Sequence, residues 1–314
     1  MLANIQLISN FYKVIRQIHY TQIQKKRDDV INNHNIEMKM KNDETRLCHM
    51  NIMSSHNSYL SNYQNFDFAD ISTVEFLIKL GVRCLEFDVY YINERLFIGH
   101  GTKNLFGGYD FITTNFVKLE DVFKLIANCA FRDFSDLPLI INLELLVNDN
   151  MDAYQKISAK IKKYFYGYVL HSKFHNAAIN IGNCKMKHLK KKIIFITQRK
   201  LKNDNPLAKY INAYTYNIGE INKMDEIDSK YILNLSYKEF LQNKKIISEH
   251  IQKKGLVRIY PHGSFATNFS TNYNFLECIK LGIQIPAINI QQMGSISLQY
   301  IQHFQSPFLI SSVS

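Results

Sequence analysis

Short apolar segments alternate with amphipathic segments along the chain from about residue 46 onward. Segments rich in β-branched and aromatic residues are predicted to be strands, at residues 82–91, 95–100, 137–146, 191–199, 231–236, 255–261 and 283–291. Segments with apolar residues at helical spacing are predicted to be helices, at residues 119–131, 152–165 and 272–282. The run LPLIINLELL is apolar almost throughout, which is typical of a parallel strand buried on both faces. The alternation predicts an α/β fold, either a barrel or a doubly wound sheet.

Two polar stretches suggest how the chain is divided. Residues 1–23 have apolar residues at helical spacing and are followed by a polar connector, so residues 1–45 are predicted to be a helical and polar extension. Residues 202–229 are polar and irregular, and we expect them to join a first half at 46–201 to a second half at 230–314. The sequence has no secretion signal and no apolar run long enough for a membrane-spanning helix.

The formal net charge of +11 favours an acidic partner, which would be nucleic acid, anionic lipid or a phosphorylated substrate. No helix-turn-helix pattern, zinc-finger spacing or aromatic RNA-binding pattern is present, so we expect no nucleic acid partner. The five cysteines are scattered without paired spacing. We therefore expect reduced thiols in a cytosolic protein, with neither a disulfide framework nor a zinc site.

Three carboxylates lie within predicted strands that are otherwise apolar. Glu86 and Asp88 are two residues apart, so their side chains face the same side of the strand. Glu144 is a single carboxylate inside the run LPLIINLELL. Buried like charges are unfavourable unless a cation or a proton offsets them. Carboxylate oxygens are hard ligands, so the sequence predicts a Ca²⁺ site here.

Two histidines accompany these carboxylates at predicted strand ends. His56 and Asn57 lie in the segment MSSHNSYL, and His100 closes the strand at 95–100. A single histidine at a strand end is usually a hydrogen-bonded structural residue, whereas two beside a carboxylate cluster favour a catalytic site. In a parallel α/β barrel, catalytic groups lie at the carboxyl ends of the strands, where these residues are expected.

Long stretches of the chain resemble the eukaryotic phosphoinositide-specific phospholipase C family. MSSHNSYL, STVEFLIKLGVRCLEFDVYY and a strand ending in His-Gly resemble the X half of its catalytic domain, and LVRIYPHGSFATNFSTNYNFLECIKLGIQIPAINIQQ resembles the Y half. The resemblance covers about residues 46–201 and 231–292. It implies a distorted (β/α)8 barrel of the TIM type that is split into X and Y halves.

The resemblance also implies roles for the candidate residues. The implied Ca²⁺ ligands are Asn57, Glu86, Asp88 and Glu144. The implied catalytic groups are His56, His100 and Glu86, with Glu86 taking the proton of the inositol 2-hydroxyl and His100 protonating the leaving group. Bacterial relatives that need no metal place an arginine in its site, and the sequence shows none among these ligand positions.

The headgroup-binding residues match the family only in part. Arg258 and Tyr260 match its RIY motif, which implies a ring-phosphate contact and a contact with the inositol ring. Thr197 and Arg199 align with two lysines of the family, and Asn234 aligns with a serine. The implied substrate-binding residues are therefore Arg199, Asn234, Arg258 and Tyr260, with weaker recognition of polyphosphorylated rings.

These features together predict a Ca²⁺-dependent phosphoinositide phospholipase C that acts through a cyclic intermediate. Its expected partner is a phosphoinositide at an anionic membrane surface, and its expected location is cytoplasmic and peripheral at the inner membrane surface, with the oligomeric state left open. One alternative is a barrel of the glycerophosphodiester phosphodiesterase type, although the sequence has His-Asn-Ser where that family has His-Arg-Gly. A second alternative is a catalytically lapsed phosphoinositide-binding barrel, which would have lost a histidine or a ligand.

Overall fold

The computed structural model describes residues 20–34, 36–37, 42–62, 67–103, 109–198, 200–221, 223, 227–263 and 271–311. The chain divides into two units, at residues 1–35 and 36–314. In the first unit, residues 20–33 are helical. The polar residues that follow residue 23, which were predicted to be a connector, therefore continue the helix to residue 33. Residues 1–19 of the helix predicted at 1–23 lie outside the described residues.

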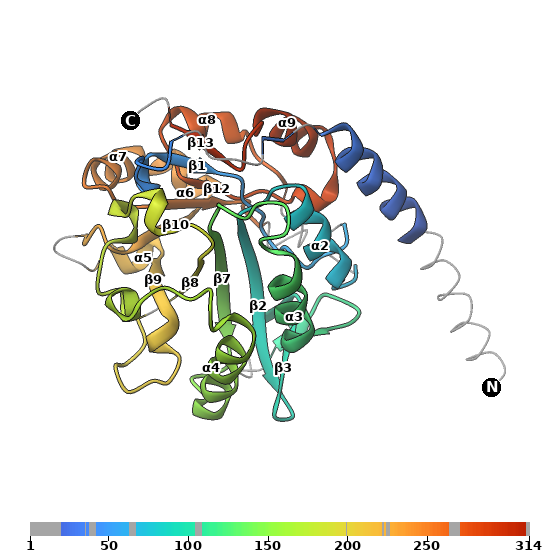
Figure 1. Ribbon diagram of the computed structural model, residues 1–314, viewed down its shortest axis with the longest axis horizontal. Coiled ribbons are helices and arrows are strands. Elements are labelled where there is room, and N and C mark those ends of the chain that lie inside the picture. Colours follow the sequence, from blue (N-terminus) through green and yellow to red (C-terminus); the bar gives the residue numbers. More distant parts are fainter. Residues whose placement is uncertain are drawn as a thin grey trace. The chain divides into compact units, whose positions relative to one another are not determined.

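The second unit is built on a sheet of nine strands in which most pairs are parallel (Figure 1). The strand order is β12 (Ile285–Pro286), β11 (Val257–Tyr260), β10 (Ile232–Ser236), β9 (Ile211–Tyr216), β8 (Ile193–Gln198), β7 (Leu139–Leu146), β2 (Cys84–Ile92), β3 (Arg95–Ile98) and β6 (Val117–Lys118). Every pair from β12 to β2 is parallel, whereas β3 and β6 are antiparallel additions. Two small sheets pair β1 (Met50–Ile52) with β13 (Phe308–Ile310), and β4 (Gly101–Lys103) with β5 (Tyr109–Phe111).

Residues 54–55 connect the two ends of the parallel run. Ser54 forms a parallel bridge with Cys84 of β2, and Ser55 forms a parallel bridge with Ile288, just after β12. The Ser55 N–H donates to the Cys84 carbonyl at 2.9 Å, and the His56 N–H donates to the Ile288 carbonyl at 2.9 Å. Seven parallel strands and this segment thus occupy the positions of an eight-membered ring. The prediction of an α/β barrel of the TIM type is confirmed, with single bridges at the closure.

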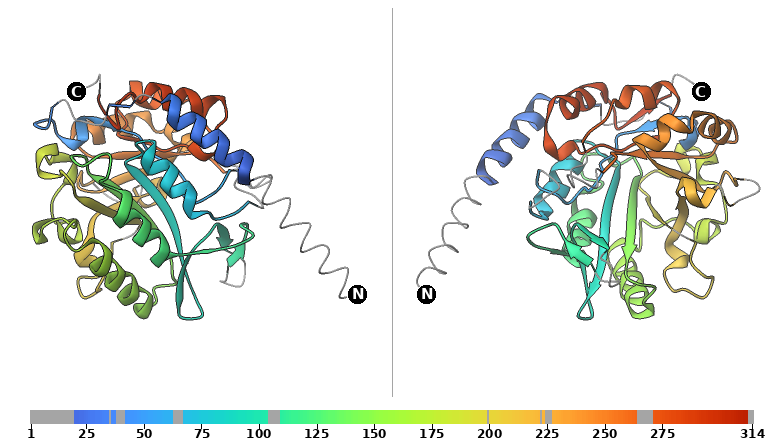
Figure 2. Two further views of the ribbon diagram at one scale, coloured as in Figure 1. Left: turned by 45° about the vertical axis from the view of Figure 1, so that its right-hand side comes forward. Right: turned by 180° about the vertical axis from the view of Figure 1, so that it is seen from behind.

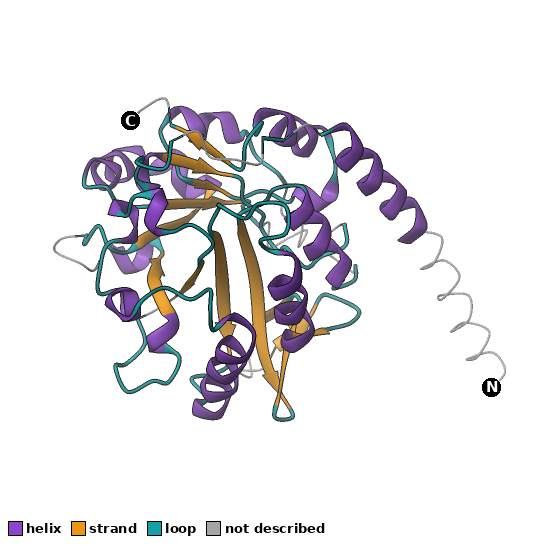
Figure 3. Ribbon diagram, viewed as in Figure 1, coloured by secondary structure: helices purple, strands orange, loops and turns teal. Residues whose placement is uncertain are grey.

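Helices lie outside the strands (Figure 3). The α-helices are α2 (Ile71–Lys79), α3 (Leu119–Cys129), α4 (Met151–Phe165), α5 (Ile218–Ile221), α6 (Tyr237–Gln242), α7 (Lys244–Gln252), α8 (Phe275–Lys280) and α9 (Ser295–His303). Short 3₁₀ turns are η1 (Leu47–His49), η2 (Ser172–Ala177), η3 (Ile181–Asn183), η4 (Met186–His188), η5 (Ala208–Tyr210) and η6 (Ile290–Gln292). Helix α4 begins where the Asn150 side chain accepts a hydrogen bond from the Ala153 N–H, which satisfies a free donor of the first turn.

The segment predicted to be an irregular join contains a barrel strand. Strand β9 lies between β8 and β10 and is buried along nearly its whole length. Its sequence, INAYTY, shows neither helical spacing nor clear alternation, because Asn212 and Thr215 are buried polar residues. Asn212 accepts a hydrogen bond from the Phe195 N–H where the β8–β9 register shifts, and donates one to the Phe174 carbonyl. The prediction of an irregular segment was therefore wrong for residues 211–216. The strand predicted at residues 283–291 is also shorter, since only Ile285–Pro286 pairs as β12.

Alternation along the strands divides the barrel interior into an apolar end and a polar end. At the amino end, Cys84, Ile140, Ile194, Ala213 and Ile232 belong to one buried apolar cluster. Further along β2 and β7, the paired positions become polar. The barrel is therefore filled at its amino end and carries its chemistry at the carboxyl end. Among the described residues, no helix is both long enough and apolar enough to cross a membrane.

Candidate active site

Two polar layers on β2 and β7 form the floor of the site. The parallel register pairs Glu86 with Asn142 and Asp88 with Glu144, directly beyond the apolar pair of Cys84 and Ile140. Side chains two residues apart on a strand face the same side, so these four polar groups project together at the carboxyl end of the barrel. The structure thus brings together the three carboxylates that the sequence singled out.

Glu86 is buried and is held by two hydrogen-bond donors and one ion pair. Its carboxylate accepts the Asn57 N–H at 3.0 Å and the Asn142 amide at 3.2 Å. The Arg258 Nη2 atom lies 2.7 Å from Glu86 Oε1, and the Arg258 side chain is only 1% exposed. Burial by itself would raise the pKa of Glu86, but the Arg258 guanidinium and the His56 ring lower it below its usual value. Glu86 is therefore ionised at neutral pH.

Asp88 connects a tyrosine to the second histidine. Its Oδ2 atom accepts the Tyr59 hydroxyl at 2.9 Å and lies 3.3 Å from His100 Nδ1. The other carboxylate oxygen, Oδ1, is buried and has no hydrogen-bond partner among the residues that the structure describes. A buried acceptor without a donor is unfavourable, so this oxygen is suited to a cation. The contact through Nδ1 leaves Nε2 of His100 as the atom that can reach a substrate.

Glu144 lies beside Asp88 but is open to solvent. Burial among protein atoms and the charges of Asp88 and Glu86 raise the pKa of Glu144 above its usual value. Its side chain is nevertheless exposed at the barrel mouth, and hydration reduces the effect of burial. The direction of the shift is the one expected for neighbouring carboxylates without a cation.

His56 is positioned by a residue for which the sequence suggested no role. Its Nδ1 atom lies 2.9 Å from Asn289 Oδ1, and its Nε2 atom lies 3.7 Å from Glu86 Oε2. An amide oxygen can only accept, so Nδ1 carries the proton and Nε2 faces the site. Asn289 is fixed in turn, because its N–H donates to Asn272 Oδ1 at 2.7 Å and its carbonyl accepts from Asn272 Nδ2 at 3.1 Å. Burial lowers the pKa of His56, and the Tyr260 ring stacks on it at 6.0 Å between centroids.

Asn57 adopts a conformation that asparagine tolerates better than most residues. Its φ angle is 47°, in the left-handed region. Gln291 Nε2 donates to the carbonyls of His56 and Asn57 at 3.2 and 3.3 Å, which holds this turn in place. The Asn57 Oδ1 atom lies 3.4 Å from the Tyr59 hydroxyl, whose proton goes to Asp88 at 2.9 Å.

These oxygen atoms fit a hard cation, with one rearrangement. In the part of the chain that the structure describes, no three His, Cys, Asp or Glu side chains are already arranged as a metal cluster. The unpartnered oxygen of Asp88 and the open carboxylate of Glu144 are nevertheless adjacent by register. Both are oxygen donors of the kind that Ca²⁺ prefers. Glu86 can join them only by giving up part of its contact with Arg258.

Three of the four predicted substrate-binding residues, Asn234, Arg258 and Tyr260, lie next to one another beside Glu86 and His56. Arg258 donates to Asn234 Oδ1 at 2.7 Å, and its guanidinium lies 5.3 Å from the centre of the Tyr260 ring. Thr197 is fully buried and its hydroxyl donates to the Leu143 carbonyl at 2.6 Å, so it faces away from a ligand. Arg199 lies outside the described residues.

Two family models match most of the chain. The model described as "Phosphatidylinositol-specific phospholipase C, X domain" matches residues 44–199, and the one for the Y domain of the same enzyme matches residues 205–305. The Y-domain match thus begins before β9, earlier than the predicted start of the second half at residue 230. No curated protein sequence matches the chain.

Solved structures share the fold at low sequence identity. PLC21 from L. pealei is 18% identical, with a TM-score of 0.71 over 89% of this chain and 39% of its own length. PLC21 from S. officinalis is 19% identical, with a TM-score of 0.70 and 38% of its length covered. A calcium-dependent phosphoinositol-specific phospholipase C from Pseudomonas sp is 16% identical, with a TM-score of 0.57 and 96% of its length covered. The chain therefore spans about two fifths of the PLC21 proteins that it matches.

Proposed function

The chain belongs to the phosphatidylinositol-specific phospholipase C family, and we propose on that basis that it hydrolyses a phosphoinositide lipid to diacylglycerol and an inositol phosphate through a cyclic intermediate. The observation that supports this most is the convergence of His56, His100 and three carboxylates at the carboxyl end of one barrel. A phosphodiester needs a base, an acid and charge stabilisation within a few ångströms of one another, and these side chains offer all three.

The proposed Ca²⁺ ligands are Asn57, Glu86, Asp88 and Glu144. When bound, Ca²⁺ would stabilise negative charge on the phosphodiester and lower the pKa of the inositol 2-hydroxyl. The Asp88 oxygen that lacks a hydrogen-bond partner in the described structure and the neighbouring carboxylate of Glu144 support a cation at this place.

The two histidines have different proposed roles because their partners differ. Asn289 holds the proton of His56 on Nδ1, which directs Nε2 toward the site, where in its protonated form it donates to a phosphoryl oxygen. Asp88 contacts Nδ1 of His100, so that Nε2 of His100 can deliver a proton to the diacylglycerol oxygen. His100 then accepts a proton from the water that opens the cyclic phosphate.

Glu86 is the proposed base for the 2-hydroxyl proton. Its lowered pKa keeps it ionised, and its contact with Arg258 keeps it in place until substrate arrives. Arg258 is also the proposed contact for a ring phosphate, with Tyr260 against the inositol ring. Substrate binding that draws Arg258 away from Glu86 would make Glu86 more basic.

The headgroup site supports a modest preference among ring phosphates. Thr197 offers neither charge nor a free hydroxyl, and Asn234 already accepts from Arg258. A charge-assisted hydrogen bond contributes roughly 1.5–3 kcal/mol, so the loss of one lysine contact would cost about ten- to hundredfold in discrimination. We expect phosphatidylinositol and its monophosphate to be cleaved with only a small disadvantage relative to the bisphosphate. Rates on vesicles of equal surface charge test this, and a strong bisphosphate preference that Arg199→Ala abolishes would contradict it.

The proposed location is cytoplasmic and peripheral at the inner membrane surface, where this substrate class is found. The activity itself is tested by release of water-soluble inositol phosphate from phosphatidylinositol vesicles. We expect turnover by the wild type and none by His56→Ala/His100→Ala. No release by the wild type on any phosphoinositide would favour a barrel that only binds lipid.

A further inference from the structure

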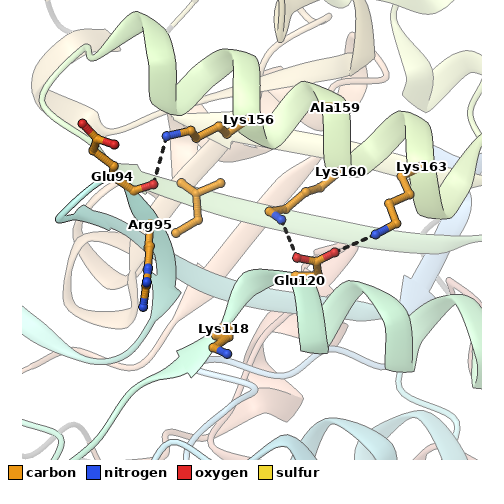
Figure 4. A pocket seen from close by; sticks show the side chains of 9 residues that line it. Glu94, Arg95, Lys118, Glu120, Lys156, Ala159, Lys160 and Lys163 are labelled. Carbon is orange, nitrogen blue, oxygen red and sulfur yellow. Dashed lines mark hydrogen bonds and ion pairs between the residues drawn. The ribbon is translucent and has the colours of Figure 1, made fainter.

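A pocket of about 570 Å³ lies on the outer side of the barrel, and none of its lining residues belongs to the site described above. Its walls come from the β2–β3 hairpin, strand β6, the start of α3 and one face of α4 (Figure 4). Five basic side chains line it, namely Arg95, Lys118, Lys156, Lys160 and Lys163. The volume is that of a small-molecule site, large enough for a phosphorylated headgroup.

The pocket lies at the same end of the barrel as the catalytic groups. Strand β2 continues past Asp88 to Ile92, and the hairpin turn follows it (Figure 2). The turn at Glu94 is six residues beyond Asp88, which corresponds to roughly 20 Å of extended strand. A surface that presents a lipid headgroup to the barrel mouth would therefore approach this hairpin as well.

The basic side chains of the pocket carry more positive charge than the neighbouring carboxylates neutralise. The Glu120 carboxylate accepts both Lys160 and Lys163 at 2.8 Å, and Asp152 pairs with Lys156 at 2.7 Å. The Glu94 side chain points away from the other charged groups, and only its main-chain oxygen contacts Lys156 (Figure 4). Even with Glu94 counted, five basic groups face three carboxylates, which leaves a charge of about +2.

The two basic residues at the pocket edge, Arg95 and Lys118, are available to bind a ligand. The side chains of Arg95 and Lys118 make no ion pair or hydrogen bond with any residue that the structure describes, and both are exposed. Lys160 uses a single N–H donor, toward Glu120, although an ammonium carries three, and Lys163 also donates to Glu120. Glu120 thus holds these two lysines in fixed positions, and its pKa is lowered to about 2 by their hydrogen bonds. Positioned ammonium groups lose less side-chain entropy when an anion binds.

We propose that this pocket is a second, non-catalytic site for a phosphate-bearing anion, and that its occupant is the headgroup of an anionic phospholipid other than the substrate. An arginine and several lysines around one cavity are the groups that bind phosphate. Exposed ion pairs contribute little to folding stability, so stability does not account for the gathering of five basic groups. A lipid bound here would hold the barrel mouth against the bilayer between turnovers. The proposal depends on the proposed function only in assuming that the protein acts at a membrane.

Vesicle co-sedimentation in the presence of a chelator tests the site without catalysis. The probe is phosphatidylcholine vesicles with and without phosphatidylserine, containing no phosphoinositide. The test variant is Arg95→Ala/Lys118→Ala. The matched control is Lys124→Ala/Lys162→Ala, which removes the same charge from exposed positions on α3 and α4 that do not line the pocket. Thermal unfolding of both variants checks that each is folded.

The test variant should bind phosphatidylserine vesicles about 30-fold more weakly, because each of the two basic side chains contributes about 1 kcal/mol to binding near an anionic surface. The control should lose little. Titration with inorganic phosphate forms the second arm. If the test variant loses phosphate binding but keeps vesicle binding, the phosphate site stands and the lipid as its occupant is wrong. Equal losses in both variants, or no loss in either arm, would overturn the proposal. Neither result depends on whether the protein hydrolyses lipid.

Discussion

Arg258 is expected to stabilise the folded barrel mainly by offsetting the buried charge of Glu86. The two side chains are 1% and 5% exposed and their charged atoms are 2.7 Å apart. Arg258→Met keeps the volume of the side chain but leaves a buried carboxylate without its counter-ion. Removing one partner of a buried ion pair costs about 3–5 kcal/mol, out of a total stability of about 5–15 kcal/mol. We therefore expect the variant to fold with a much lower free energy of unfolding at neutral pH.

The pH dependence identifies the cause of this loss. In the wild type, the pKa of Glu86 lies below its usual value of 4.5, so the pair adds stability above that pH and loses it as the pH falls through the folded-state pKa. Without Arg258, burial raises the pKa of Glu86, and the ionised form becomes unfavourable as the pH rises above 4.5. The destabilisation should thus be largest at neutral pH. It should fall to about 1–3 kcal/mol in acid, the cost of the lost hydrogen bonds.

Urea unfolding followed by far-UV circular dichroism measures this, because the chain has no tryptophan. Arg83→Met is the matched control, since Arg83 is equally buried but donates to the carbonyls of Ala130 and Ile78. The free energy of unfolding that Arg83→Met loses should be the same in acid and at neutral pH. Glu86→Gln/Arg258→Met should recover most of the stability that Arg258→Met loses. A loss for Arg258→Met that is as large in acid as at neutral pH would refute this account.

Two further predictions concern the histidines. His100→Ala should lower turnover by ~10²–10⁴-fold while calorimetric Ca²⁺ affinity stays nearly unchanged, and near-normal turnover would mean that another group supplies the proton. Asn289→Leu should lower kcat about tenfold with little change in KM, because one buried hydrogen bond to His56 is lost, and Asn289→Asp should restore part of the rate by keeping an acceptor. Equal losses in Asn289→Leu and Asn289→Asp would show that the residue acts only through packing.

The local patterns of apolar and polar residues were sufficient to predict the α/β class and most strands of the barrel. Strands β2 and β7 stand out in the sequence because they are apolar almost throughout, which leaves the carboxylates of Glu86 and Glu144 as exceptions within apolar runs. Strand β9 was missed because its buried Asn212 satisfies main-chain groups at a register shift, a role that depends on the neighbouring strand.

Contacts between residues distant in sequence could not be predicted. Arg258 on β11 and Glu86 on β2 are far apart in the sequence, and only the arrangement of the strands in a ring brings their charged atoms to 2.7 Å from each other. The sequence therefore predicted no arginine near the metal ligands, and Arg258 was expected only to contact a ring phosphate. Asn289 lies in the stretch that resembles the Y half, but its contact with His56 depends on the closure of the barrel at residues 54–55.

The proposal of a Ca²⁺-dependent phospholipase C is tested most directly by one comparison. Inositol phosphate release from phosphatidylinositol vesicles is measured with the wild type and with Asp88→Asn, in Ca²⁺ and in chelator. The account predicts release by the wild type that Ca²⁺ supports and chelator abolishes, and a strong loss in Asp88→Asn at the same Ca²⁺ concentration. Undiminished release in chelator would contradict the ligand assignment, and would indicate that Arg258, already beside Glu86, supplies the positive charge instead.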